Sequence, residues 1–239
     1  MNDARPLAWL FDIDGTLLLT EGAAREAFAA AARETLDLAV EDDLKDVSFA
    51  GRIEPMILAD ILAKHGRSFS EAEEAHFWNI VFQNMRRLLH PGRGHLLPGV
   101  LPLLDALAAE PRWVIGLLTG NMTEMARIKL DRFGIWERFA FGGFGEQAVS
   151  RNELARALVA QVGREYGIPP AACIVVGDTE HDIECARFAG ARVVAVATGS
   201  YRRDQLAAGE PDLLLDDLRD ARGLMRWARG LAEPSTKPA

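Results

Sequence analysis

Residues 7–16 read Leu-Ala-Trp-Leu-Phe-Asp-Ile-Asp-Gly-Thr, a short apolar run that ends in two aspartates and a glycine. Such a run is typical of a strand buried on both faces of a parallel sheet. Ligands bind at the carboxyl ends of the strands in these sheets, so we expect Asp12 and Asp14 to enter the same crevice. Gly15 permits a sharp turn after them. Because Asp-x-Asp-Gly is also common in exposed turns, its meaning depends on the rest of the chain.

Short apolar runs recur along the chain, and most are followed by a helical pattern. Besides residues 7–11, they span residues 113–118, 138–141, 173–176, 193–196 and 213–215. Alternation of this kind predicts an α/β fold in which crossover helices link parallel strands. We therefore expect a doubly wound, Rossmann-like parallel sheet as the core of the protein.

Residues 22–95 break this rhythm, because they contain no convincing strand. Apolar residues recur there at helical spacing, in one stripe from Ala24 to Leu36 and a stronger one from Trp78 to Leu89. Proline and glycine breakers at residues 91–99 mark a return to the core. The pattern predicts an all-helical cap of residues 22–95, inserted into a catalytic core of residues 1–21 and 96–239. The alternative is that these helices are simply further core.

The composition excludes several classes of partner. The chain has 239 residues, 49% of them hydrophobic, which suffices for one large domain or a core with an appendage. Its 35 acidic and 27 basic side chains leave a net charge of −8, which argues against binding nucleic acid or an anionic membrane surface. A small anionic substrate stays compatible, since it responds to the local field of its pocket.

The cysteines and the N-terminus indicate a cytoplasmic protein. Cys173 and Cys185 lie in apolar settings without repeated spacing, which favours buried, inert thiols in a reducing compartment over a disulfide or a zinc site. The apolar run before Asp12 is too short for a signal peptide, and no stretch approaches the length of a membrane span.

The second long apolar run ends in Thr119-Gly120-Asn121, directly before a helix expected to begin near Asn121. A helix start offers unpaired N–H groups and a field that favours a phosphate. The sequence thus provides a hydroxyl and free amides for phosphate binding. An ordinary helix cap is the alternative interpretation.

The run at residues 173–176 ends in Gly-Asp-Thr-Glu-His-Asp, so carboxylates again follow a strand. Asp178 and Asp182 are four residues apart and can project from one turn toward a hard cation such as Mg²⁺. The alternative is that Asp178 caps a helix and Asp182 is solvated. His181 is interpreted as exposed or as a supporting residue, because a lone histidine among carboxylates does not suggest zinc.

Complementary groups at three strand ends resemble the haloacid dehalogenase superfamily, in particular its phosphatase branch with a helical cap, of which phosphoglycolate phosphatases are the nearest members. The resemblance runs from about Leu7 to Asp217. It implies a nucleophile at Asp12, a general acid and base at Asp14, and phosphate binding by the Thr119–Asn121 segment. It also implies Mg²⁺ held by Asp12, by the main-chain carbonyl of Asp14 and by Asp178, with Asp182 supporting the site.

The family's third motif is usually a lysine, and here the chain departs from it. The corresponding segment is Ser150-Arg151-Asn152-Glu153-Leu154, so Arg151 is expected to replace the lysine and bind phosphate. A guanidinium keeps the positive charge and can bridge two oxygens. A helix capped by Ser150 with a solvated Arg151 is the alternative. Lys129, in the helix after Thr119, is expected to be a surface charge.

These residues predict a Mg²⁺-dependent phosphatase that hydrolyses small phosphorylated metabolites through a phospho-aspartate. A haloacid dehalogenase typically lacks an acid at Asp14, and a phosphonate hydrolase needs a lysine in an apolar setting, which neither Lys45 nor Lys64 has. A sugar phosphomutase is less favoured, because Glu54 stands where such mutases tend to have a base. A non-catalytic binding module on the same fold stays open. Arg52 is a candidate for a cap residue that faces the substrate.

Overall fold

The centre of the fold is a parallel sheet. The computed structural model describes residues 5–38 and 44–232, and within these ranges the sheet has six strands in the order β5-β4-β1-β6-β7-β8. The strands are β1 (Leu7–Phe11), β4 (Trp113–Leu118), β5 (Phe141–Gly143), β6 (Cys173–Gly177), β7 (Arg192–Val196) and β8 (Leu213–Leu215). Strand β1 pairs with β4 on one side and β6 on the other. The three strand ends that carry the candidate residues are therefore neighbours.

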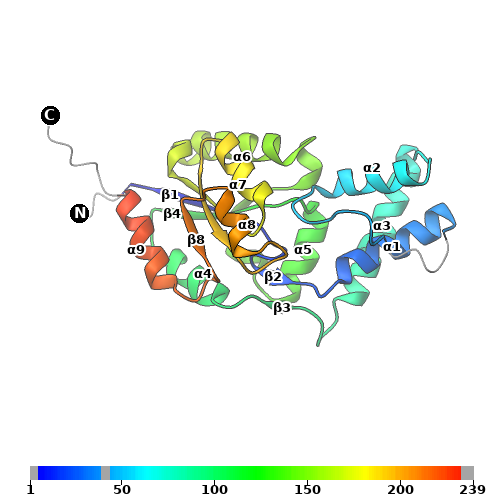
Figure 1. The fold of residues 1–239 in the computed structure, drawn as a ribbon, viewed down its shortest axis with the longest axis horizontal. Helices are drawn as coiled ribbons and strands as arrows, with labels where there is room; N and C mark the ends of the chain where they lie inside the picture. The colour runs from blue at the N-terminus through cyan, green and yellow to red at the C-terminus, as the bar shows by residue number, and fades with distance from the viewer. Residues whose placement is uncertain (1–4, 39–43, 233–239) are drawn as a thin grey trace.

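Helices cover both faces of the sheet, as Figure 1 shows. One face packs against α4 (Val100–Ala108), α5 (Thr123–Arg132) and α9 (Ala221–Ala232), and the other against α6 (Arg151–Tyr166), α7 (Glu180–Phe188) and α8 (Arg203–Ala208). Short 3-10 helices lie in the connections, at η1 (Trp136–Arg138), η2 (Gly145–Gln147) and η3 (Pro170–Ala172). The expected doubly wound α/β core is confirmed.

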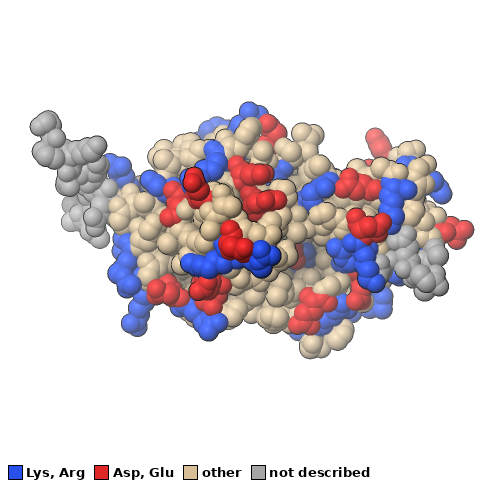
Figure 2. All heavy atoms as spheres, in the orientation of Figure 1, with Lys and Arg blue, Asp and Glu red and all other residues tan. Residues whose placement is uncertain are grey.

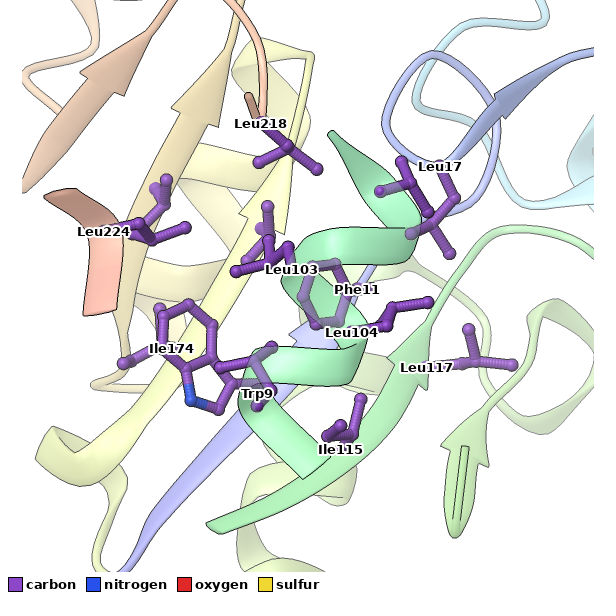
Figure 3. Packing of buried hydrophobic residues seen from close by; sticks show 14 of the residues in the cluster. Trp9, Phe11, Leu17, Leu103, Leu104, Ile115, Leu117, Ile174, Leu218 and Leu224 are labelled. Carbon is purple, nitrogen blue, oxygen red and sulfur yellow. The ribbon is translucent and has the colours of Figure 1, made fainter. Parts of the chain in front are cut away.

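The first face carries a large apolar core around β1. Trp9 and Phe11 point from the sheet toward Leu103 of α4 and Leu224 of α9 (Figure 3), and all four side chains are buried. Alternate residues Ala8 and Leu10 face the opposite helices. Burial on both sides explains why this strand reads as a continuous apolar run.

In the described part of the chain between β1 and β4, three helices form a separate group, as expected for a helical insertion. They are α1 (Ala23–Leu36), α2 (Glu54–Lys64) and α3 (Glu71–Leu88), and they lie at the opposite end of the molecule from α9 (Figure 1). The group has an apolar cluster of its own, in which Phe28 makes edge contacts with Phe77 and Trp78. Because Met125 of α5 belongs to this cluster, α5 connects the insertion to the sheet.

A short antiparallel pair, β2 (Leu18–Leu19) and β3 (His95–Leu96), lies where the chain leaves the core and returns to it. No strand was expected there, since two residues are too few to show a period. Two boundaries also differ from the expected ones. Residues 136–138 form η1 and the strand follows at Phe141–Gly143, while α5 begins at Thr123 with Met122 as its cap.

The expected chemistry of the cysteines is confirmed: Cys173 and Cys185 are buried and free, and burial raises the pKa of each thiol to about 12. On the face drawn in Figure 2, basic and acidic side chains are interspersed over the described part of the chain. Within the described ranges, no helix combines the length and apolar character that crossing a bilayer needs.

Candidate active site

A cavity of about 260 Å³ lies at the carboxyl ends of β1, β4 and β6. From the core it is lined by Asp12, Asp14, Gly15, Gly120, Asn121, Lys129, Arg151, Asp178, Thr179, Gly199 and Ser200. From the insertion and its connections it is lined by Leu19, Thr20, Gly22, Ala24, Arg25, Phe49, Ala50, Gly51, Arg52, Glu54 and Ile57. The helical insertion therefore covers the strand ends, and charged groups from both parts face one space.

Asp12 lies at the end of the central strand, where its backbone N–H donates to the carbonyl of Val176 on β6 (2.9 Å). The side chain is 5% exposed, and one carboxylate oxygen lies 3.2 Å from the guanidinium of Arg151. Burial raises the pKa of Asp12 to about 6, although Arg151 acts in the opposite direction. Asp12 thus combines a buried carboxylate with a fixed positive charge beside it.

Asp178 lies beside the turn after Asp12. Its carboxylate accepts a hydrogen bond from the hydroxyl of Thr16 (3.1 Å), and burial together with nearby carboxylates raises its pKa well above the usual range. The space around it is kept open by two glycines: a Cβ would come within 2.3 Å of the carboxylate from Gly15 and within 1.7 Å from Gly199. Gly15 also has a positive φ of 83°.

Asp182 is fully buried, which excludes the solvated alternative considered for it. One oxygen accepts from the backbone N–H (3.0 Å) and hydroxyl (2.7 Å) of Thr179, and the other from Arg151. Both oxygens are therefore engaged by the protein. The arrangement holds the start of α7 and orients the guanidinium of Arg151.

The carboxylates of Asp12, Asp178 and Asp182 have oxygens within 4.8 Å of one another, and all three are buried. Packing like charges in a low dielectric is costly without a counter-charge. The oxygen donors and the open cradle at Gly15 and Gly199 fit a hard divalent cation such as Mg²⁺. The donor set therefore suits the metal that the sequence suggests.

Arg151 is the first residue of α6 after its cap, Ser150, and is 8% exposed, so the solvated alternative is wrong. Its guanidinium lies between the carboxylates of Asp12 and Asp182 and lines the cavity. These carboxylates hold the pKa of Arg151 well above the usual value against the effect of burial. The side chain carries a permanent positive charge directly beside Asp12.

Only part of the Thr119–Asn121 segment faces the cavity. Gly120 and Asn121 line the cavity, whereas the fully buried Thr119 does not. The hydroxyl of Thr119 accepts hydrogen bonds from the backbone (3.2 Å) and the side chain (2.7 Å) of Asn121. Asn121 also donates to Asp14 (2.8 Å), which lines the cavity. Thr119 thus lies behind the asparagine.

The expectation that Lys129 is a surface charge is wrong. Its side chain is 2% exposed, and its Nζ donates to Asp14 (2.6 Å) and to the side-chain oxygen of Asn121 (2.5 Å). Lys129 lies four residues after Met125 and three after Ala126, on the buried face of α5. This spacing was the available signal that the lysine points inward, toward the charged groups of the cavity.

Besides Arg25, the insertion contributes two charged residues of different kinds to the cavity. Arg52 lines the cavity but also pairs with the half-exposed Asp60 (2.6 Å). Glu54 is 5% exposed, and its carboxylate accepts from the backbone N–H of Met122 (2.8 Å). His181, interpreted as exposed or supporting, is partly exposed and contacts the insertion at Gly51, where a Cβ would lie 2.2 Å from its ring.

Burial of Glu54 makes the stability of the protein depend on pH. Burial raises the pKa of Glu54 to about 8, with Lys129 opposing and Asp14 and Glu146 adding to the rise. Because the folded-state pKa lies above the ordinary value, this contribution to stability is present below about pH 4.5 and is lost as pH rises through about 8. We expect Glu54→Gln to raise the melting temperature relative to wild type by roughly 5 °C more at pH 9 than at pH 5. Thermal melts at both pH values measure this, and an equal difference at the two would contradict it.

Comparison with known proteins agrees with this geometry. A family model described as haloacid dehalogenase-like hydrolase matches residues 8–190. A protein of Dickeya dadantii named Probable phosphatase IndB is 27% identical over 234 residues, covering 98% of each chain. A phosphoglycolate phosphatase of Synechococcus elongatus is 37% identical over 125 residues, which span 52% of this chain and 57% of the relative.

Among solved structures, that of a predicted phosphoglycolate phosphatase from Haemophilus somnus matches with a TM-score of 0.74 and 22% identity. The match covers 92% of this chain and 98% of the other. At this identity the similarity concerns the fold, and it extends over both the sheet and the helical insertion.

Proposed function

Because the chain belongs to the haloacid dehalogenase-like hydrolase family, we propose that it is a Mg²⁺-dependent phosphatase that hydrolyses small phosphate monoesters through a phosphorylated Asp12. The observation that carries this proposal is the group formed by Asp12, Arg151 and Asp178 at the end of the central strand. It combines a buried carboxylate, a fixed cation and further carboxylate oxygens in one space.

The reaction begins with attack of Asp12 on the phosphorus atom, which forms an acyl phosphate and breaks the bond to the leaving oxygen. Arg151 lies beside Asp12, so its guanidinium offsets charge on the transferring oxygens. When bound, a divalent cation supplies further positive charge that reduces the repulsion between Asp12 and the phosphate.

Asp14 acts as the general acid and base. It donates a proton to the leaving alkoxide and then, once ionised, accepts a proton from the water that hydrolyses the acyl phosphate. Lys129 and Asn121 both donate to one oxygen of Asp14, which leaves the other oxygen free of these two bonds. We assign to this pair the role of holding Asp14 in the cavity.

We further propose that residues 22–95 act as a cap over a core of residues 1–21 and 96–239 and exclude water during the reaction. Relatives named phosphoglycolate phosphatase make 2-phosphoglycolate the first ester to test. We take Thr119 to act through Asn121, and Gly120 and Asn121 to contact the phosphate. Purified protein with Mg²⁺ should release inorganic phosphate from p-nitrophenyl phosphate and from members of a panel of phosphorylated metabolites. No release from any ester would refute the proposal.

Metal removal provides a second test. We expect a chelator to abolish turnover and added Mg²⁺ to restore it. Asp178→Asn should raise the Mg²⁺ concentration for half-maximal activity by roughly tenfold or more, and by more than Asp182→Asn does, because both oxygens of Asp182 are already engaged. Titrations of activity against Mg²⁺ for the three proteins measure this. Full turnover in excess chelator would contradict the metal requirement.

A further inference from the structure

Glu54 is a buried carboxylate that the proposed reaction does not use. It lies in the first turn of α2, faces the cavity and is 5% exposed. A buried acid costs free energy unless its oxygens are hydrogen-bonded, so its partners indicate what it is for. Its carboxylate accepts from the N–H of Met122, which lies outside the insertion.

Two hydrogen bonds join Glu54 to the loop that follows β4. Its backbone N–H donates to the carbonyl of Gly120 (2.8 Å), and its side chain accepts from the N–H of Met122 (2.8 Å). Met122 is the cap residue of α5, and Glu54 opens α2. Both N–H groups belong to helix starts, which leave such groups without intrahelical partners. The start of α2 therefore supplies the acceptor for the N–H of Met122, and the loop before α5 supplies the acceptor for the N–H of Glu54.

Contact between the two segments is close along the main chain. A Cβ on Gly120 would come within 2.0 Å of the carbonyl oxygen of Arg52, and one on Gly145 within 2.2 Å of the carbonyl oxygen of Gly120. Only residues without a side chain fit at these positions. The backbone of residues 52–54 thus packs directly against the loop at these glycines.

The same loop holds Asn121, one of the two residues that donate to Asp14. Asn121 lies between Gly120 and Met122, donates to Asp14 and accepts from Lys129. Both residues bonded to Glu54 are therefore immediate neighbours of Asn121. A change in the position of α2 reaches Asp14 through a hydrogen bond to Gly120 or Met122, the covalent link to Asn121 and the hydrogen bond from Asn121 to Asp14.

The geometry points to Glu54 as a positioning residue that fastens α2 to the loop of residues 119–122 and thereby fixes Asn121 and Lys129 against Asp14. The kinetic part of this inference rests on the proposed phosphatase function. The carboxyl needs only to accept a hydrogen bond from Met122, so a neutral amide in its place retains the contact. Because Glu54 acts through Asp14, which protonates the leaving oxygen, its loss affects an ester with a poor leaving group at least as strongly as one with a good leaving group.

The test compares Glu54→Ala, Glu54→Gln and wild type as intact proteins. We expect Glu54→Ala to lower kcat/KM for 2-phosphoglycolate by about 10- to 100-fold and for p-nitrophenyl phosphate by the same factor or less, and Glu54→Gln to recover most of the loss. Hydrogen exchange at the Met122 amide should accelerate in Glu54→Ala by about tenfold or more and stay within about threefold of wild type in Glu54→Gln.

Glu146→Ala is the matched control. Glu146 accepts from the N–H of Thr123 at the same helix start (3.0 Å) but does not line the cavity. We expect its kcat/KM to stay within about threefold of wild type, with faster exchange at Thr123 and not at Met122. A melting temperature measured for each variant separates local effects from unfolding.

Unchanged exchange at Met122 in a folded Glu54→Ala protein would overturn the contact, and unchanged kcat/KM would overturn the positioning role. A loss more than about tenfold larger for p-nitrophenyl phosphate than for 2-phosphoglycolate would also overturn it, because protonation by Asp14 matters more for the poorer leaving group of 2-phosphoglycolate. If wild type hydrolyses no ester, the phosphatase proposal fails, while the exchange measurement still decides whether Glu54 fastens the two segments.

Discussion

Asp12→Asn should abolish turnover while the protein stays folded. An amide is a poor nucleophile, so the acyl phosphate cannot form, and we expect kcat to fall by a factor on the order of 10⁴ or more, as when a nucleophile is removed from other covalent enzymes. Stability should not fall, because burial raises the pKa of Asp12 and a neutral amide of the same shape avoids that cost. Steady-state kinetics and a thermal melt measure the two effects.

A covalent label identifies the nucleophile directly. Rapid acid quenching of wild type with labelled phosphate ester should trap label on Asp12, and the Asn variant should trap none. Asp105→Asn serves as the control, since Asp105 is an exposed aspartate that pairs with Arg138 away from the cavity. A folded Asp12→Asn protein that keeps wild-type turnover would refute the mechanism.

Arg151→Ala should have the second-largest effect. Its removal leaves repulsion between Asp12 and the phosphate offset only by the metal, so the transition state loses an electrostatic partner. We expect kcat to fall by a factor on the order of a hundred or more, comparable with loss of an oxyanion donor elsewhere. Arg151→Lys should recover part of this loss, because charge returns without the bidentate geometry.

Two further variants make this prediction specific. Arg156→Ala, on the exposed face of the same helix, removes an arginine that pairs with Glu153 and should leave kcat within about threefold of wild type. Lys129→Met removes a charge that contacts Asp14 and not Asp12. We therefore expect it to impair proton transfer by Asp14 and to leave the role of Arg151 beside Asp12 unchanged. Near-wild-type kcat in a folded Arg151→Ala protein would show that the third motif lies elsewhere, and Lys129 would be the next candidate.

Much of the fold was predictable because it depends on local pattern. A strand buried on both faces must be apolar throughout, so β1, β4 and β6 are visible as runs, and the residues after them reach one edge of the sheet. The three-residue strand β5 lies at Phe141–Gly143, later than the predicted run at residues 138–141. The two-residue strands β2 and β3 were not predicted. The position of such short strands depends on the strands they pair with, and a local sequence pattern does not show this pairing.

The sequence by itself determined the strand ends that carry Asp12, Asp14 and Asp178, because main-chain direction and hydrophobic burial fix them. Only the tertiary structure decided which charged side chains are buried around these aspartates. Lys129 is buried because α5 packs between the sheet and the insertion, and Glu54 is buried because α2 docks on the loop after β4. Whether a charged side chain is solvated or paired depends on groups distant in the chain, so its burial is a property of the assembled fold.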